Sequence, residues 1–208
     1  MGFFQSLFGH RSSSHVESVP DQIWLTHDAK INGIRKQLAE PRSPSVEAIL
    51  LVAHFDDLLD QLERIEESFQ GETPIKAVPA SNLNDALASS LNMDSSAKLE
   101  LIVAERHPLP TGDQLLVDFA DKLPCGVRLS HHLSLDDTIV LHLLGDSVSR
   151  LVSMLGADEH EAITSSMVTK RLQMAQKKMA QRVKGNRQAH SAAQWLEINC
   201  PNLPHSRP

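Results

Sequence analysis

The hydrophobic pattern of the chain switches between the two periods that mark strands and helices. Continuous apolar runs at 46–55 and 99–104 are typical of central parallel strands, because both faces of such strands are covered. Shorter apolar runs predict three further strands, at 23–26, 74–78 and 127–131.

Apolar residues at helical spacing lie between and after these strands. Ile31, Ile34 and Leu38 share one face of a first helix, and Thr26 is suited to cap its start. Further helices are expected at 58–69, 82–91, 135–143, 148–155, 165–184 and around 195–196. Strands that alternate with helices predict an α/β protein with a mostly parallel sheet and right-handed crossovers.

The chain of 208 residues is long enough for one sizeable core with an appendage. We predict a flexible amphipathic N-terminal tip at 1–20, an α/β domain at 21–156, a helical extension at 157–200 and a disordered tail at 201–208. Gly156 marks the end of the predicted domain, since glycine commonly terminates a helix.

Charge is distributed unevenly along the chain. Beyond Ile163 there are eight lysines and arginines against Glu197 alone, so this part carries +7 and the rest −13 of a net −6. Such asymmetry predicts that the basic tail docks on the acidic body or meets an anionic partner. The candidate partner-binding residues on the last long helix are Lys170, Arg171, Lys177, Lys178 and Arg182. The apolar stripe of this helix is also compatible with a homodimer.

The first eight residues form a second candidate partner surface. They contain Phe3, Phe4, Leu7 and Phe8, and the last three share one helical face. A helix this short is marginal in water, so a membrane, a partner or the protein's own surface must order it. We expect a cytoplasmic protein. The tip at 1–8 is a candidate peripheral contact to the inner face of the membrane.

Several catalytic classes lack their sequence signatures. The phosphate-cradling loop Gly-x-x-x-x-Gly-Lys-Ser/Thr, the dinucleotide fingerprint Gly-x-Gly-x-x-Gly and the hydrolase elbow Gly-x-Ser-x-Gly do not occur. Cys125 and Cys200 are too few for a disulfide framework, and no apolar run has the length of a membrane span. Nucleic-acid binding is not favoured, because the chain is acidic and its basic helix lacks interleaved aromatic residues.

No catalytic or metal-ligating residue is predicted. His107, His131 and His132 lie near Asp113 and Asp136 in the sequence, but their spacing is not that of a metal site. The pairs Asp56-Asp57 and Asp136-Asp137 are explained by helix N-termini, where the helix dipole favours acidic residues.

The stretch from Glu105 to Asp137 resembles a known family. Glu105-Arg106-His107, Asp113 and Leu133-Ser134-Leu135-Asp136-Asp137 are similar to the second motor domain of SecA preprotein-translocase ATPases, aligned without a gap. Short segments downstream that also match the family lie at 155–156, 161–163, 167–170, 175–178 and 195–196. The resemblance implies a three-layer RecA-like domain, which is a P-loop NTPase-type fold here without a P-loop, followed by a helical extension.

The departures from the family concern its catalytic chemistry. Two motor domains of the family clamp ATP and drive polypeptide through a membrane channel, but the first motor domain has no counterpart here. The positions that match the family's catalytic arginines read Val117, Phe119 and Lys122, and neighbouring glycine positions read Asp118 and Asp121. Neither Val nor Phe can stabilise a transferred phosphoryl group, and Lys does not replace a bidentate Arg.

We therefore predict a catalytically inactive, motor-domain-like binding or regulatory module, linked by the resemblance to protein export and to translocase components as partners. No cofactor is expected. One alternative is half of a composite ATPase, in which Arg106, Lys122 and Arg128 would face the phosphates of ATP. Another is an unrelated α/β domain with a small-molecule pocket near His54, Glu105 and His107.

Overall fold

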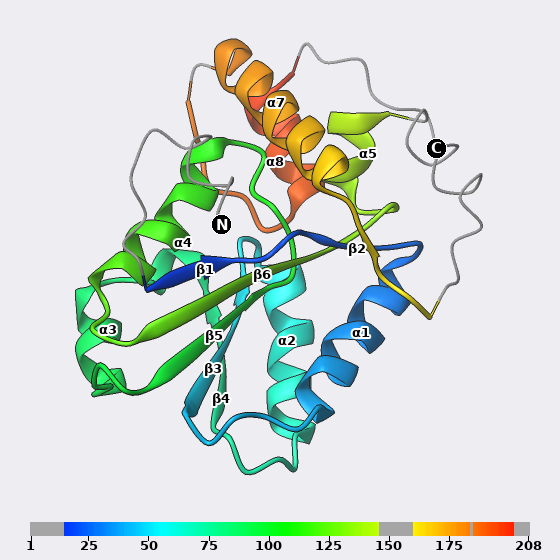
Figure 1. Ribbon diagram of the computed structural model, residues 1–208. Coiled ribbons are helices and arrows are strands. Elements are labelled where there is room, and N and C mark those ends of the chain that lie inside the picture. Colours follow the sequence, from blue (N-terminus) through cyan, green and yellow to red (C-terminus); the bar gives the residue numbers. More distant parts are fainter. Residues whose placement is uncertain (1–14, 146–159, 184, 202–208) are drawn as a thin grey trace.

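The computed structural model describes residues 15–145, 160–183 and 185–201. Within these residues, seven strands form one sheet in the order β4-β3-β5-β6-β2-β7, with β1 also paired to β6 (Figure 1). The pairings are parallel except that of β2 with β7. The strands are β1 (Val16–Ser18), β2 (Gln22–Trp24), β3 (Val46–Ala53), β4 (Ile75–Pro79), β5 (Lys98–Val103), β6 (Gly126–Ser134) and β7 (Ile163–Thr164).

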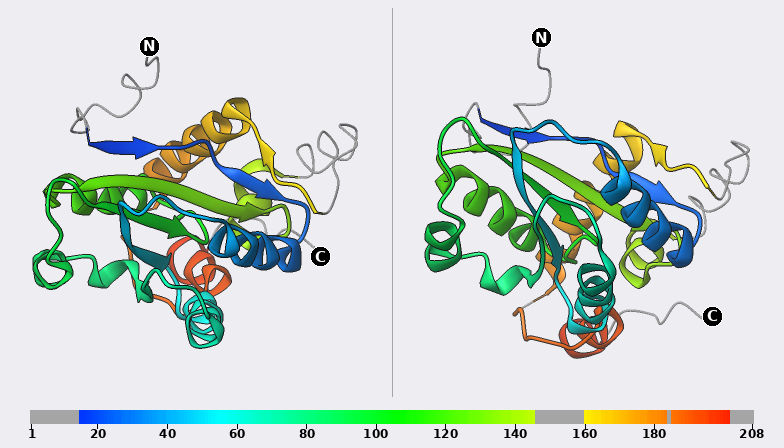
Figure 2. Two further views of the ribbon diagram at one scale, coloured as in Figure 1. Left: turned by 60° about the horizontal axis from the view of Figure 1, so that its bottom comes forward. Right: turned by 90° about the horizontal axis from the view of Figure 1, so that it is seen from below.

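Helices cover both faces of the sheet, so the domain has three layers (Figure 2). One face carries α1 (His27–Ala39) and α2 (Asp56–Ser68), and the other carries α3 (Asp85–Leu91) and α4 (Pro110–Lys122), with the short helix η1 (Ala80–Asn82) beside them. Alternate residues of β3 serve the two cores: Ile49 and Leu51 pack with α1 and α2, whereas Leu50 and Val52 pack with α4. The predicted α/β class with a mostly parallel sheet is confirmed, and the arrangement is consistent with a RecA-like fold.

The first two strands form a single interrupted edge along β6. Val16 lies opposite Val127, and Gln22 lies opposite His132, so β1 and β2 pair with successive parts of the same strand. Val16–Ser18 therefore belong to the sheet, although they fall within the range 1–20 for which a flexible tip was predicted. The cause is that β6 is nine residues long, which leaves room for both short strands. Residues 1–14 lie outside the described part.

The predicted helical extension is joined closely to the domain. β7 adds an antiparallel strand next to β2, and the helices that follow are α7 (Ser166–Arg182) and α8 (Ala192–Asn199). Together with α5 (Thr138–Leu144), they lie over the carboxyl ends of the parallel strands (Figure 1). The expected helix at 148–155 and most of the tail at 201–208 lie outside the described residues. No described helix has the length and apolar content needed to cross a membrane.

Local sequence features explain where the helices begin. Thr26 Oγ1 accepts a hydrogen bond from Ala29 N–H at 3.1 Å, so the predicted cap of α1 is confirmed. The sequence pattern did not reveal α4, which follows the Glu105-Arg106-His107 motif. Its signals are Pro110 at the first helical position and Leu116, Phe119 and Ala120 on one buried face.

Candidate functional site

The carboxyl ends of β3, β5 and β6 are the place where open α/β sheets usually bind ligands. In this chain they deliver ionisable residues, which include His54 after β3, Glu105 after β5 and His131 within β6. Unlike an open binding site, this edge is buried: Glu105 is 8% exposed and His131 is 6% exposed. We therefore describe it as the carboxyl-edge cluster, defined by Asp21, His54, Glu105, Arg106, His107, Asp113 and His131.

Arg106 is the central cation of the carboxyl-edge cluster. Its Nη2 and Nε donate to the two carboxylate oxygens of Asp21, at 2.7 and 3.1 Å, and its Nη1 donates to Asp113 Oδ2. All three side chains are at least nine-tenths buried. Burial alone would lower the pKa of Arg106, but the two carboxylates outweigh it and the pKa is raised. The guanidinium is thus a permanently charged link between β5, α4 and the segment between β1 and β2.

Glu105 connects β5 to the start of α2. Its Oε1 accepts the backbone N–H groups of His54 and Phe55, at 2.8 and 3.0 Å. Burial raises the pKa of Glu105 to about 8, although the ammonium of Lys30 opposes the shift. Glu105 thus accepts hydrogen bonds from two backbone amides at the N-terminus of α2. This structural role does not require a ligand.

The histidines of this region are neutral because they are buried. Burial is the largest cause that lowers the pKa of His54 to about 3, and His107 and Arg106 lower it further. Burial also lowers the pKa of His131 and His107. The Nε2 atoms of His54 and His131 have no hydrogen-bond partner among the described residues. These imidazoles therefore add no positive charge at neutral pH.

The helical extension covers the carboxyl-edge cluster. Gln176 of α7 is 1% exposed, and its Nε2 donates to His107 O at 2.7 Å and to Asp113 Oδ2 at 2.8 Å. Trp195 of α8 is also 1% exposed, and its ring lies edge-on to that of His107 with centroids 5.6 Å apart. Side chains of α7 and α8 thus fill the region near His54, Glu105 and His107 in which a small-molecule pocket was predicted.

The three residues predicted to face the phosphates of ATP do not converge. Arg106 lies beyond the carboxyl end of β5, whereas Arg128 is in register with Glu100 near the start of β6, three residues before β5 ends. Those three strand residues alone correspond to about 10 Å. Lys122 is the last residue of α4 and binds Asp85 at 2.7 Å. The described fold therefore does not bring these three cations together at one site.

Each of these three cations also lies beside a carboxylate of the chain. Arg128 stands between Glu17 and Glu100 in the register of β1, β6 and β5. Arg42 Nε binds the same Glu100 at 3.3 Å, which continues this row of alternating charges. The row lines a hollow of about 300 Å³ at the amino-terminal edge of the sheet. Arg106 and Lys122 thus bind carboxylates of the chain, and Arg128 lies in register with two acidic residues.

The residues at the positions that match the family's catalytic arginines have structural roles. Phe119 is 2% exposed in the core beneath α4, and Val117 packs against the same core. Asp118 accepts a hydrogen bond from Gln114 Nε2 at 2.8 Å on the exposed side of the helix. Side chains at these positions support α4 and do not line a phosphate site.

The other ionisable candidates have partners inside the chain. His132 accepts from Trp24 Nε1 at 3.2 Å through Nδ1, and its Nε2 lies 2.7 Å from Gln37 Oε1. Asp137 binds the buried ammonium of Lys30 at 2.6 Å, and Asp136 accepts His27 N–H at 3.0 Å. Among the described residues, no three His, Cys, Asp or Glu side chains are placed to hold a metal ion.

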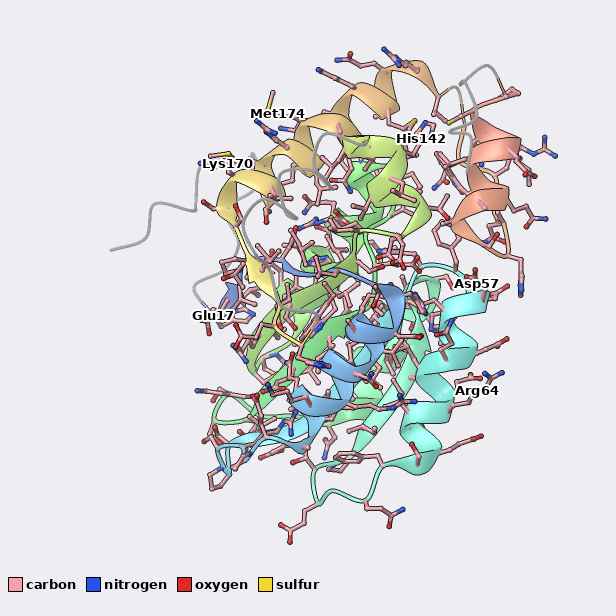
Figure 3. All side chains as sticks on the ribbon, turned by 90° about the vertical axis from the view of Figure 1, so that its right-hand side faces the viewer. Glu17, Asp57, Arg64, His142, Lys170 and Met174 are labelled. Carbon is pink, nitrogen blue, oxygen red and sulfur yellow. The ribbon has the colours of Figure 1, made fainter. Side chains whose placement is uncertain are left out.

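The predicted partner-binding residues fall into two groups. Phe3, Phe4, Leu7 and Phe8 lie outside the described residues. The basic residues Lys170, Arg171, Lys177, Lys178 and Arg182 all lie on α7 and are exposed. Figure 3 shows the side chain of Lys170 on the outer side of this helix, beside Met174.

Sequence reasoning did not identify Asp21 as a member of the carboxyl-edge cluster, nor Gln176 and Trp195 as residues that cover it. Gln176 carried a signal, because it lies on the apolar face of α7 between Leu172 and Met179. A polar residue on a buried helical face needs an internal partner. Its partners are 63 and 69 residues away in the sequence, so the spacing within α7 does not reveal them.

Comparisons with known proteins add little to this description. No protein-family model and no curated protein matches the chain. Among solved structures, the chain is similar to the C-terminal part of the Fun30 ATPase domain, with 15% sequence identity and a TM-score of 0.35. The similarity covers 73% of this chain and 54% of that structure, so the chain spans about half the length of its neighbour.

Proposed function

We propose that the chain is a catalytically inactive binding module derived from a motor domain of the SecA type. The observation that carries the proposal is the arrangement around Arg106. Arg106 is 5% exposed, its guanidinium binds Asp21 and Asp113, and Gln176 of α7 donates to the same Asp113 oxygen, so the guanidinium is not available to a phosphate. The cation that matches the family motif therefore serves the fold.

The retained motif residues support the same proposal. Glu105 holds the start of α2 through two amides, and Asp137 holds Lys30 and the Ser134 hydroxyl, at 2.6 and 2.7 Å. These contacts give structural reasons for keeping the motif after catalysis is lost. The SecA relationship itself rests on the sequence resemblance.

The loss of catalytic arginines supports an inactive module on energetic grounds. An arginine that stabilises the transferred phosphoryl group contributes roughly 10³–10⁵ in rate. Val117 and Phe119 pack in the core at the matching positions, and Lys122 is bound to Asp85. The composite ATPase alternative gains no support, because its three cations are separated and two of them, Arg106 and Lys122, bind carboxylates of the chain.

The test is a calorimetric titration of the full chain with MgATP, combined with a phosphate-release assay. We expect no heat of binding at nucleotide concentrations of about 1 mM and no hydrolysis above the buffer rate. Binding at micromolar concentration, or hydrolysis that Arg106→Met abolishes while the protein stays folded, would show that the proposal is wrong. Lys76→Met is the matched control, since Lys76 is an exposed lysine on the edge strand β4.

A further inference from the structure

Exposed apolar side chains are concentrated on one pair of helices. Among the described residues, the large hydrophobic side chains that remain exposed are Leu141 at 38%, Met167 at 59% and Met174 at 60%. Leu141 lies on α5 and the two methionines lie on α7, and these helices pack against each other. Apolar surface that is gathered in one place indicates an interaction site more strongly than scattered residues do.

The same surface is strongly basic. α7 carries five lysines and arginines and no acidic residue over its 17 residues. None of the five has an ion-pair partner within the part of the chain that the structure describes. They differ in this respect from Arg106 at the carboxyl edge, which binds two carboxylates. Ion pairs among the described residues therefore do not offset the positive potential of α7.

The exposed residues of α7 repeat every seven positions. Met167 is followed by Lys170 and Arg171, and Met174 is followed by Lys177 and Lys178. Seven residues are about two helical turns, or about 10.5 Å, so both sets lie on the same side of the helix. We call these six residues the outer face of α7, and Figure 3 shows Lys170 and Met174 projecting from it.

From this pattern we propose that the outer face of α7 binds an acidic amphipathic helix of a partner protein. Apolar side chains of the partner, repeated every seven residues, would contact Met167 and Met174, and flanking Asp or Glu residues would meet the four cations. Methionine suits such a surface because its flexible side chain adapts to different neighbours. The inference rests on the proposed function as a binding module and specifies the partner's chemistry.

Two other anionic occupants fit the surface less well. A helix that enters a bilayer inserts its apolar face, but that face of α7, with Val168, Leu172 and Met179, is buried against the domain. A second copy of the chain would offer the acidic helix α2. The outward residues of α2 include Asp60, Glu63 and Glu67, and no large apolar side chain of α2 is exposed to meet the methionines.

The test uses the full chain and a fluorescent peptide of three heptads, with leucine at the apolar positions and glutamate elsewhere. Fluorescence anisotropy would follow binding, and a peptide of the same composition in scrambled order would report charge alone. The variant K177E/K178E is compared with R35E/R64E, which makes the same charge change on α1 and α2. We expect K177E/K178E to weaken binding about tenfold or more and R35E/R64E to weaken it about threefold or less. Met174→Asp should weaken it as well.

Three results would overturn the inference. The first is an equal loss of affinity in the two charge variants, and the second is equal binding of the ordered and scrambled peptides. The third is binding to phosphatidylglycerol vesicles, or self-association in sedimentation, that K177E/K178E abolishes while the peptide does not bind. A MgATP titration of the same samples separates the two proposals, because nucleotide binding contradicts the inactive module and leaves the peptide result standing.

Discussion

The carboxyl edge of the sheet and the outer face of α7 both carry arginine or lysine side chains, but in different environments. At the carboxyl edge, Arg106 is buried and binds Asp21 and Asp113. On α7, Lys170 and Lys177 are exposed and have no ion-pair partner among the described residues. A buried charge must be matched by the fold itself, whereas an exposed one remains available to another molecule. The place to look for binding is therefore α7.

The largest expected effect comes from removing the buried cation. Arg106→Met leaves the carboxylates of Asp21 and Asp113 without their partner, and we expect a loss of about 3–5 kcal/mol in the free energy of unfolding. Urea denaturation measures this loss. Lys122→Met removes an exposed ion pair and should cost about 1 kcal/mol or less. Equal stability of the two variants would contradict the contrast between buried and exposed cations.

A smaller loss is expected where α7 covers the carboxyl-edge cluster. Gln176→Ala removes the donor to His107 O and Asp113 Oδ2, so the loss should be about 1–3 kcal/mol. Gln181→Ala on the exposed side of the same helix should change stability by about 0.5 kcal/mol or less. Hydrogen exchange of the amides at 105–109 should rise in Gln176→Ala alone. If exchange there stays unchanged, α7 does not seal this edge.

Glu105 links the carboxyl edge to the pH dependence of stability. Its pKa rises from 4.5 to about 8 on folding, so the native state holds a proton that the unfolded state has released at neutral pH. Stability should therefore fall as pH rises through this range, by about 1 kcal/mol between pH 7 and pH 8. The buried histidines act in the opposite direction, because each is protonated to about a quarter at pH 7 in the unfolded state only, and each adds about 0.1 kcal/mol of stability between pH 7 and pH 8.

The variant Glu105→Gln isolates this effect. The glutamine oxygen still accepts the amides of His54 and Phe55 but does not titrate. The change in stability from pH 7 to pH 8 should be about 1 kcal/mol more negative in the wild type than in the variant, which keeps the contribution of the histidines. The same slope in both proteins would show that another group is responsible.

The smallest effect is expected on the outer face of α7. Replacing Lys177 and Lys178 together by glutamine should change the free energy of unfolding by about 0.5 kcal/mol or less, because neither makes an ion pair among the described residues. Thermal denaturation at matched ionic strength measures the change. A loss as large as that of Gln176→Ala would assign these lysines to the fold and remove them from the binding surface.

Much of the fold follows from local patterns in the sequence. The apolar runs predicted β3 and β5, and helical spacing predicted α1, α2 and α7, because each pattern reports burial of one element. The sequence prediction did not include the helix α4, although Pro110 is a residue that favours the start of a helix.

The composition of the carboxyl-edge cluster was harder to predict. Asp21 and Arg106 are 85 residues apart, and Gln176 and Asp113 are 63 residues apart, so no local period connects them. The sequence resemblance marks Glu105 and Arg106 as motif residues. Their structural role is seen only in their hydrogen bonds to α2 and to Asp21.

The most direct test of the account is one set of amide and side-chain NMR spectra, recorded with MgATP and then with the acidic amphipathic peptide. The account predicts that the peptide shifts resonances on α7, from Met167 to Lys178, and that MgATP shifts no resonance of Arg106 or His54. Saturable shifts of Arg106 and His54 with MgATP, without any response on α7 to the peptide, would contradict it.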